Sequence, residues 1–414
     1  MRIAIVGSGI SGLSAAYLLH ADHEITLFEA DDRVGGHTHT VPVDLGGERH
    51  AVDTGFIVFN ERNYPNFVRL LGRLGVASHE TTMSFSVRCD RTGLEYNGTS
   101  INRLFAQRRN LVNPGFYRML RDILRFNREA PSVLEGGREG TTVGEYVTEN
   151  RYSEAFTERY LIPMGAAIWS APPGHFRDFP IRFVVEFFRN HSLLSLHGRP
   201  VWRVIDGGSF RYVEALTRGF RDRIRTGWPV RSVTRQPDRV SVTAGANQVE
   251  AFDHVVLACH ADQALQVLRD ASDRERELLE AFPYQPNDVV LHTDVSVLPK
   301  RRLAWGSWNY RIRRERTDRV TLTYDMNMLQ GLDASRVFCV TLNEDGLVSP
   351  AHVIRRLTYH HPLFTSTRAA AQKRHAEVIN VNRTSFCGAY WGYGFHEDGL
   401  ASALRVCRPL GGAL

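Results

Sequence analysis

The sequence predicts an α/β protein with two interleaved domains, one built on a parallel sheet and one made of a mixed sheet plus a helical cap. Two observations predict this fold. The first 36 residues begin with a strand, a glycine-rich turn, a helix and a second strand. Related strand–helix patterns return near residues 200–270 and 375–414, and the 414 residues are enough for two sizeable cores.

The first unit, MRIAIVGSGISGLSAAYLLHADHEITLFEADDRVGG, is typical of a Rossmann-like dinucleotide-binding domain. Residues Arg2 to Val6 form an apolar run of strand type, and three glycines follow it. Gly7 permits the tight turn, Gly9 lets a pyrophosphate approach the backbone, and Gly12 lets the helix pack closely on the sheet. The N-terminus of that helix offers unpaired N–H groups and a positive dipole end to the phosphates.

Glu29 ends the second strand, where a carboxylate can accept hydrogen bonds from ribose hydroxyls. It would repel a 2′-phosphate, which disfavours NADP. Two alternatives to nucleotide binding would also explain this N-terminal segment: a signal peptide, or a glycine-rich turn that binds no ligand. Three glycines break the apolar run, and no clear small-residue cleavage site ends it before Glu24. Nucleotide binding is therefore the favoured interpretation.

The continuation DRVGGHTHT, from Asp32 to Thr40, resembles the flavin-containing amine oxidase and phytoene desaturase superfamily. There a second glycine pair follows the ribose acid and brings backbone close to the cofactor, which implies FAD rather than NAD. The segment AVDTGFIVFN, residues 51–60, is similar to the strand and turn near the flavin ring. Amine oxidases usually carry arginine after the glycine pair, whereas this chain has His37.

The second block begins near WRVIDGGSFRYVEAL, residues 202–216, and continues through two strand-like runs that predict a hairpin across QPD, residues 230–243. The resemblance maps Val230 to the adenine edge. DHVVLACHADQAL, residues 253–265, is then predicted as a buried strand followed by a helix. It resembles the superfamily's return strand to the nucleotide-binding sheet.

The third block is FCGAYWGYGFHEDGLASALRV, residues 386–406. The resemblance places Gly388 near the pyrophosphate and predicts a helix that opens at residues 397–400. Its N–H groups would face the pyrimidine side of the flavin, where a reduced flavin carries negative charge that a helix N-terminus stabilises. The alternative is an ordinary capped C-terminal helix.

The resemblance therefore implies a glutathione-reductase-type, amine-oxidase-like domain that binds FAD. Binding is expected to be non-covalent, since no cysteine or histidine stands in an obvious linkage motif. The predicted cofactor-binding residues are Gly7, Gly9, Ile10, Ser11, Gly12, Glu29, Gly35, Gly36, His37, Thr38, Thr54, Gly55, Phe56, Val230, Gly388, Glu397, Asp398, Gly399 and Leu400.

The predicted FAD-binding domain comprises residues 1–72, 200–270 and 375–414, and the predicted substrate domain comprises residues 73–199 and 271–374. Residues 73–199 are largely helical in pattern. Strand-like runs in the substrate domain, expected to form the mixed sheet, are VVLHTDVSVL (289–298) and RVTLTYDM (319–326).

Composition limits the alternatives. Apolar residues make up 43% of the chain and charged residues 23%, as in ordinary soluble globular proteins. No apolar stretch reaches the length of about twenty residues that a transmembrane helix needs. The five cysteines are scattered without metal-ligand spacing, which predicts no metal site and favours a reducing cytoplasm. The net charge is +6, and no nucleic-acid partner is predicted.

The two lysines of the chain bear on the class of reaction. In amine oxidases of the superfamily a lysine commonly hydrogen-bonds a water at the flavin N5 atom. Lys373 lies in a segment predicted to be an exposed helix, and Lys300 lies in a basic run that predicts a solvated turn. Neither setting resembles that of the family's lysine, which disfavours an amine oxidase.

The predicted substrate domain is rich in apolar and aromatic runs, such as residues 162–173, 179–202 and 304–310. Most of these side chains are expected in the core, but their density is what a long apolar pocket needs. His191 is a catalytic candidate whose alternative role is structural, and Tyr310 is a second candidate. The predicted pocket residues are Asn60, Trp169, His191, Trp305, Trp308 and Tyr310.

Residues 116–128, FYRMLRDILRFNR, predict a basic amphipathic helix. One face carries Phe116, Met119, Leu120, Ile123 and Leu124. The other carries Arg118, Arg121, Arg125 and Arg128. Such a helix can lie on an anionic membrane, which places the protein at the inner face of the cytoplasmic membrane. The alternative is a helix packed on the core with a solvated arginine face.

The runs NHSLLSLHGRPVWRVIDGGS and GAYWGYGFHEDGL resemble one bacterial branch of the superfamily. The resemblance implies partnership with cyclopropane-synthase-like methyltransferases and dehydrogenation of a methyl-branched phospholipid acyl chain on the way to furan fatty acids. The expected reaction moves a hydride from an activated C–H bond to the flavin. The alternatives are an amine or amino-acid oxidase and a non-catalytic flavin-binding redox module.

Overall fold

The structure is a computed structural model that describes residues 1–136, 140–195, 197–315, 317–365 and 367–414. One domain is built on a five-stranded parallel sheet with the order β10-β2-β1-β14-β20. Its strands come from three separate segments of the chain: β1 (Arg2–Val6), β2 (Glu24–Phe28), β10 (Ile224–Arg225), β14 (His254–Leu257) and β20 (Thr384–Phe386).

Alternating side chains of β1 serve two cores, as expected for a strand covered on both faces. Ile3 and Ile5 pack into the first core with α1 (Ile10–Leu19), α2 (Pro65–Leu74), α10 (Phe210–Thr217) and α15 (His396–Cys407). Ala4 and Val6 pack into the second core with β11 (Val230–Arg235), β12 (Val240–Ala244), β13 (Gln248–Phe252), α11 (Ala261–Val267), α12 (Asp273–Leu279) and α14 (Arg368–Lys373).

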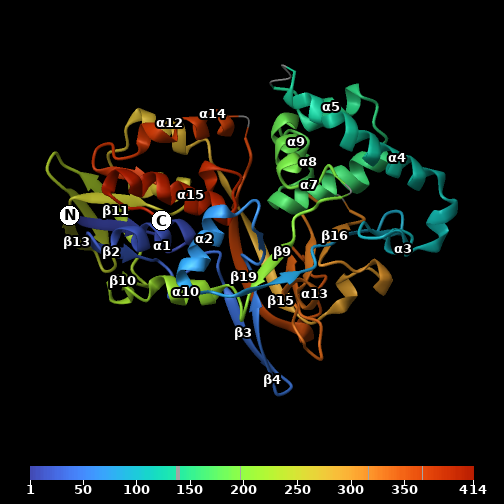
Figure 1. The fold of residues 1–414 in the computed structure, drawn as a ribbon, viewed down its shortest axis with the longest axis horizontal. Coiled ribbons are helices and arrows are strands. Elements are labelled where there is room, and N and C mark those ends of the chain that lie inside the picture. The colour runs from blue at the N-terminus through green and yellow to red at the C-terminus, as the bar shows by residue number, and fades with distance from the viewer. Residues whose placement is uncertain (137–139, 196, 316, 366) are drawn as a thin grey trace.

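A seven-stranded mixed sheet forms the centre of the molecule, in the order β19-β15-β18-β17-β16-β7-β8 (Figure 1). All its pairs are antiparallel except β16 with β7. Its strands are β7 (Phe85–Cys89), β8 (Leu94–Asn97), β15 (Tyr284–His292), β16 (Trp308–Ile312), β17 (Leu322–Asp325), β18 (Cys339–Leu342) and β19 (Val353–Pro362), with α13 (Met326–Gln330) beside them.

Smaller sheets join the two halves. The hairpin of β3 (Thr40–Leu45) and β4 (Glu48–Asp53) projects at the bottom of Figure 1. β9 (Trp202–Ile205) lies between β5 (Phe59–Asn60) and β6 (Ser78–Thr81). Because β6 and β9 come from different predicted domains, the backbone pairs across the predicted boundary at residue 72. The domain ranges themselves stay a prediction.

A helical cap covers the upper right of Figure 1. Aromatic residues dominate its core, among them Phe126, Phe156, Trp169, Phe176 and Phe188. Its helices are α3 (Ile101–Leu104), α4 (Pro114–Glu129), α5 (Val143–Glu149), α6 (Glu154–Phe156), α7 (Ile162–Trp169), α8 (Pro173–Phe176) and α9 (Ile181–Asn190).

The secondary structure agrees with several expectations and corrects others. The hairpin of β11 with β12 and the strand–helix pair β14–α11 are confirmed. The strand predicted over residues 289–298 is too long, since β15 ends at His292. Asp294 then accepts a hydrogen bond from the Ser296 N–H at 3.0 Å and turns the chain. Residues 73–199 also contain β6, β7 and β8, which sequence pattern missed.

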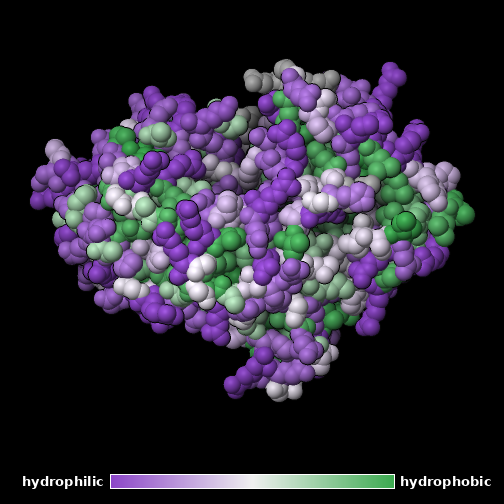
Figure 2. All heavy atoms as spheres, viewed as in Figure 1, coloured by the Kyte–Doolittle hydropathy of each residue, from purple (hydrophilic) through white to green (hydrophobic). Residues whose placement is uncertain are grey.

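On the face shown in Figure 2, apolar side chains gather at the right end, over α3 and the segment after it. Among the described residues, half of the large apolar side chains that are exposed lie between residues 101 and 124: Ile101, Leu111, Val112, Tyr117 and Leu124. No helix of the described residues is long and apolar enough to cross a bilayer.

Candidate functional site: a dinucleotide and substrate cavity

A cavity of about 1060 Å³ lies at the carboxyl edge of the parallel sheet. The ends of four parallel strands line it: Val6 and Phe28 end β1 and β2, Ala258 directly follows β14, and Gly388 lies two residues after β20. Open α/β sheets bind ligands at this edge. The opposite wall comes from β16, β17 and β19 of the mixed sheet and from α7 and α9 of the cap.

The first glycine motif leaves room for a ligand at one position only. A Cβ at Gly12 would lie 1.9 Å from the Gly7 carbonyl oxygen, so this glycine is needed for α1 to pack. A Cβ at Gly9 would meet nothing within 4 Å. Gly9 is the N-cap of α1 and lines the cavity. Open space before a helix N-terminus fits the pyrophosphate of a dinucleotide.

Glu29 lies on the cavity wall with a fixed carboxylate. One oxygen, Oε2, accepts hydrogen bonds from the Ser8 N–H at 2.8 Å and the Ser8 hydroxyl at 2.5 Å. The other oxygen accepts the Asp31 N–H at 2.9 Å. These bonds orient an acidic group at the end of β2, where the sequence motif expects the ribose partner.

Gly36 of the second glycine pair and Gly55 lie where two chain segments pack closely against each other. A Cβ at Gly36 would approach the Gly9 Cα to 2.9 Å, and one at Gly55 would approach the His37 carbonyl oxygen to 2.1 Å. Gly35 has a φ of 115° and turns the chain, so that the Thr38 N–H donates to its carbonyl at 2.9 Å. Gly36 and Gly55 line the cavity, whereas Gly35 does not.

Four histidines gather at the dinucleotide end of the cavity: His37, His260, His360 and His361. The His37 ring centroid lies 5.5 Å from that of His361 and 6.1 Å from that of His260. Burial, reinforced by neighbouring cationic groups, lowers the pKa of His37 and of His361 to about 3 and that of His260 to about 4. The His37 Nε2 atom is buried and has no hydrogen-bond partner. Its imidazole is thus neutral and available to a ligand.

A buried amide pair fixes the orientation of His361. The Asn287 side-chain amide lies 2.9 Å from His361 Nδ1, and Asn343 in turn donates to the Asn287 carbonyl oxygen at 2.8 Å. Both asparagines are almost fully buried, on or beside the neighbouring strands β15 and β18. With Nδ1 accepting from the amide, Nε2 carries the proton and serves as the donor of this ring.

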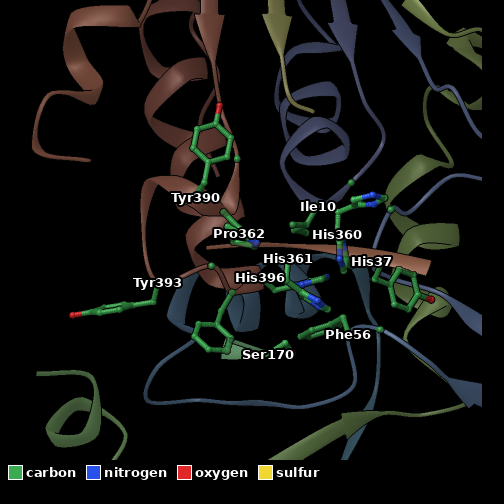
Figure 3. Close-up of a pocket in the computed structure, with 18 of the residues that line it drawn as sticks. Ile10, His37, Phe56, Ser170, His360, His361, Pro362, Tyr390, Tyr393 and His396 are labelled. Atoms are coloured by element: carbon green, nitrogen blue, oxygen red, sulfur yellow. The ribbon is translucent and has the colours of Figure 1, made fainter. Parts of the chain in front are cut away.

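α15 begins at His396, close to the predicted start. His396 lines the cavity, and its ring stacks on Phe56 with centroids 3.5 Å apart (Figure 3). Its Nε2 lies 2.9 Å from the Thr38 hydroxyl, which also meets the Tyr212 hydroxyl at 2.6 Å. His396, the first residue of α15, therefore faces the cavity, and the role expected for the N–H groups of residues 397–400 stays a prediction.

The side chains after His396 do not line the cavity. The Glu397 carboxylate accepts the N–H groups of Asn66 and Phe67 at the start of α2, and Asp398 accepts the Phe395 N–H. Burial raises the pKa of Asp398 to about 6. Gly399 packs against Ile10 and Ser11, and Leu400 lies in the core.

The structure brings most of the predicted cofactor residues together. Those that line the cavity are Gly7, Gly9, Ile10, Ser11, Glu29, Gly36, His37, Gly55, Phe56, Val230 and Gly388. The others shape it from behind, through turns, helix packing or hydrogen bonds. They are Gly12, Gly35, Thr38, Thr54, Glu397, Asp398, Gly399 and Leu400.

The other end of the cavity is aromatic and apolar. Trp169 packs against Phe187 with ring centroids 4.8 Å apart, and Trp308 meets Tyr324 edge-on at 5.1 Å. His191 stacks on Phe187 at 3.8 Å, and its Nδ1 lies 3.0 Å from the Phe187 carbonyl oxygen. Burial lowers the pKa of His191 to about 4, so the ring is a neutral part of the wall.

Three predicted pocket residues do not line the cavity. The Trp305 indole donates to the Pro299 carbonyl at 2.7 Å and packs in a separate cluster. Tyr310 lies further along β16 than Trp308 and is buried beneath the cap, so its candidacy as a catalytic residue is not supported. Asn60 is buried, and its side-chain oxygen accepts the Asn63 N–H at 2.8 Å. All three residues are absent from the cavity wall because they pack against other side chains, and these packing partners are not evident from the sequence.

Sequence analysis missed His260, His360, His361 and Tyr393, all of which line the cavity. A signal existed for the first three: His260 comes three residues after the last residue of the return strand β14, and the doublet at 360–361 precedes a proline. Both lysines are exposed and lie outside the cavity wall. The described residues contain no group of three or more potential metal ligands.

Residues 10–302 match the family model of flavin containing amine oxidoreductases. Among curated relatives, the L-amino-acid oxidase of Sistrurus catenatus edwardsii is 58% identical over 40 residues, and that of Pseudechis australis is 55% identical over 40 residues. Each match covers 9% of this chain and 8% of the relative. These relatives therefore share one short segment with the chain.

Solved structures share the whole fold at low sequence identity. A CLA-producing fatty acid isomerase from P. acnes has a TM-score of 0.69 at 17% identity, covering 99% of this chain and 98% of that one. Cyclohexylamine oxidase from Brevibacterium oxydans IH-35A has a TM-score of 0.68 at 16% identity, covering 99% of both. Reduced UDP-galactopyranose mutase has a TM-score of 0.70 at 15% identity, covering 99% and 95%.

The cofactor follows from the family and fits the site. The space in front of Gly9 suits the pyrophosphate of FAD, the oriented Glu29 carboxylate suits its ribose, and the start of α15 at the cavity-lining His396 suits its flavin. With most of its length matched by the family model, this chain belongs to the flavin-containing amine oxidoreductase family.

Proposed function

We propose that this flavoprotein dehydrogenates an apolar acyl chain, such as a methyl-branched unsaturated phospholipid chain. The observation that carries the proposal is the lining of the substrate end. Met164, Ile168, Trp169 and Phe187 supply it with apolar surface. Among the described lining residues the only carboxylates are Glu29 and Asp31, which both lie at the dinucleotide end.

The proposed chemistry asks little of the protein's own acids and bases. FAD, when bound, supplies the hydride acceptor, and the second hydrogen of the new double bond leaves as a proton. The apolar wall orients the chain and excludes water, and the neutral His191 adds no charge. The place of the protein beside cyclopropane-synthase-like enzymes stays a proposal from the resemblance of its sequence.

An amine or amino-acid oxidase is the second candidate, and two observations favour it. The family and several structural neighbours include amine oxidases. The exposed Arg199 also lines the cavity, where it can meet a substrate carboxylate. Against it, no lysine lies on the cavity wall, and the aromatic rings there pack on one another.

Anaerobic stopped-flow reduction of the flavin tests the proposal. We expect unsaturated or methyl-branched phospholipid to bleach the oxidised flavin, while primary and secondary amines and L-amino acids leave it oxidised. Rapid flavin reduction by an amine or amino acid, with none by phospholipid, would contradict acyl-chain dehydrogenation and favour an amine or amino-acid oxidase. A flavin that no compound reduces would favour a redox module.

A further inference from the structure

The exposed end of the helical cap combines apolar and basic side chains on one surface. We call residues 101–124 the cap tip; it comprises α3, a 3₁₀ turn at Arg108–Val112 and the first part of α4. The three pieces contact one another. The Tyr117 hydroxyl donates to the Leu111 carbonyl at 3.1 Å, and Phe105 packs against Phe116 with ring centroids 5.5 Å apart. The tip is therefore one packed unit.

Apolar side chains of the cap tip face outward. Val112 is 83% exposed, Ile101 79% and Leu124 53%, while Leu111 and Tyr117 are each about half exposed. Leaving aliphatic groups in water costs free energy, and a cluster of them marks a surface that meets an apolar partner. Figure 2 shows this apolar cluster at the end of the molecule over α3.

The exposed charges of the cap tip have one sign, because its single carboxylate, Asp122, is buried and accepts the Ser153 N–H at 3.0 Å. Residues 96–121 contain no aspartate or glutamate but five arginines. None of the five forms an ion pair with a described residue; Arg108 and Arg109 donate instead to backbone carbonyls, of Phe105 at 2.9 Å and of Gly93 at 2.7 Å. Arg118 and Arg121 are exposed on α4. The partner must therefore be anionic as well as apolar.

The orientation of α4 corrects the expectation for residues 116–128. Its main apolar face, with Phe116, Met119 and Phe126, is buried in the cap, so the helix cannot lay that face on a membrane. Its outer face instead alternates Tyr117, Arg121, Leu124 and Arg128 at helical spacing. This outer stripe, the adjacent exposed Arg118 and the turns before α4 are free to meet a partner.

We infer that the cap tip docks the protein on an anionic lipid bilayer. Aliphatic side chains enter the interface, a tyrosine suits the headgroup level, and unpaired arginines bind headgroup phosphates. A nucleic acid would match the arginines but not the exposed Ile101, Leu111 and Val112. The inference rests on the surface alone, and it deepens the proposed function by supplying the route to a membrane-held substrate.

Vesicle co-sedimentation of the FAD-loaded full chain tests the inference. The vesicles are phosphatidylcholine alone, or phosphatidylcholine with phosphatidylglycerol, all with saturated chains that offer no allylic C–H bond. We expect binding to the anionic vesicles at low salt, little binding at high salt, and little to phosphatidylcholine alone. Arg118→Gln with Arg121→Gln should weaken binding on the order of tenfold or more, since each arginine near the surface contributes roughly fivefold.

The double variant Ile101→Ser with Val112→Ser should also weaken binding several-fold without lowering Tm or flavin content, because both side chains are exposed in the free protein. The matched control is Arg239→Gln with Val249→Ser, two exposed positions on the distant β12 and β13 side. Its binding should equal that of the wild type.

Three results would overturn the inference: tip variants that bind like the control, equal binding to neutral vesicles, and a wild type that binds duplex DNA or RNA but not vesicles. Self-association that depends on Ile101 and Val112, without vesicle binding, would assign the tip to a second copy of the chain. Vesicle binding without flavin reduction by unsaturated phospholipid would contradict the proposed function and leave the docking surface intact.

Discussion

The two ends of the cavity are built by different means. At the dinucleotide end, backbone segments approach one another so closely that Gly12, Gly36 and Gly55 admit no Cβ. At the substrate end, the wall consists of side chains such as Trp169 and Phe187, which come from cap helices. The first end tolerates almost no change in shape, whereas the second can be altered by side-chain replacement.

This difference explains how one fold serves several reactions. The structural neighbours include an isomerase, an amine oxidase and a mutase, all at 17% identity or lower. A cofactor end fixed by backbone contacts can persist while the side chains of the other end vary. The following predictions separate the two ends, from the largest expected effect to the smallest.

Valine at Gly12 and valine at Gly9, two of the three glycines of the first motif, should have different effects. Gly12→Val should give no folded protein, because its Cβ would lie 1.9 Å from a backbone oxygen. Gly9→Val should fold but lose FAD, because its side chain would enter the open space of the cavity. Soluble yield, Tm of the apoprotein and flavin absorbance measure both, with Gly72→Val as an open-space helix control. Full flavin content in Gly9→Val would show that the nucleotide site is misplaced.

Reversing the charge of Glu29 should weaken FAD binding without unfolding the protein. Loss of two charge-assisted hydrogen bonds to a ribose, each contributing about 1.5–3 kcal/mol, predicts a decrease in affinity of about a hundredfold or more for Glu29→Arg. Quenching of flavin fluorescence measures the Kd. Glu24→Arg, at the exposed far end of the same strand, is the control and should bind FAD normally. Equal Kd values for the two variants would contradict the prediction that the Glu29 carboxylate binds the ribose hydroxyls of FAD.

Shortening a wall residue should affect turnover but not the cofactor. Trp169→Leu should slow flavin reduction by phospholipid about tenfold, since the acyl chain loses part of its apolar wall. FAD content should stay unchanged. Trp305→Leu is the matched control: it removes an equally buried indole outside the cavity, so it should lower Tm and leave the reduction rate per flavin intact. Equal rates in the two variants would place the substrate elsewhere.

The histidine cluster predicts a modest pH dependence of apoprotein stability. Burial lowers the pKa of His37, His260 and His361 from 6.5 to about 3 or 4, so the native state resists their protonation. Their stabilising effect is complete above pH 6.5 and is lost as the pH falls toward those values.

Three carboxyls act in the opposite direction, because burial raises the pKa of Asp325 as well as those of Asp53 and Asp398. Burial raises the pKa of Asp53 and of Asp398 from 3.8 to about 6, so their cost appears as the pH rises through that range and partly offsets the histidine effect. Among the described residues nine histidines have a lowered pKa and three carboxyls a raised one, so Tm should fall by a few degrees between about pH 7 and about pH 5.5. Differential scanning calorimetry measures it. His37→Gln should flatten the slope, and an unchanged slope would contradict the assignment.

The sequence by itself determined the dinucleotide end. Gly7, Gly9, Gly12 and Glu29 lie within one strand–turn–helix–strand unit, and the order of β1, α1 and β2 along the chain follows directly from local pattern. Such contacts span few residues, so periodicity and glycine spacing are enough to predict them. The hairpin of β11 and β12 was predictable for the same reason.

Only the tertiary structure decided the rest. His361 reaches His37 across more than three hundred residues because β19 crosses behind the cavity, and no local pattern encodes that contact. Trp169 lines the cavity while Trp305 does not, although both lie in aromatic runs. Whether an apolar face is wall, core or surface depends on which element packs against it, and that partner is distant in sequence. The same reason turned the apolar face of α4 inward and left the cap tip exposed.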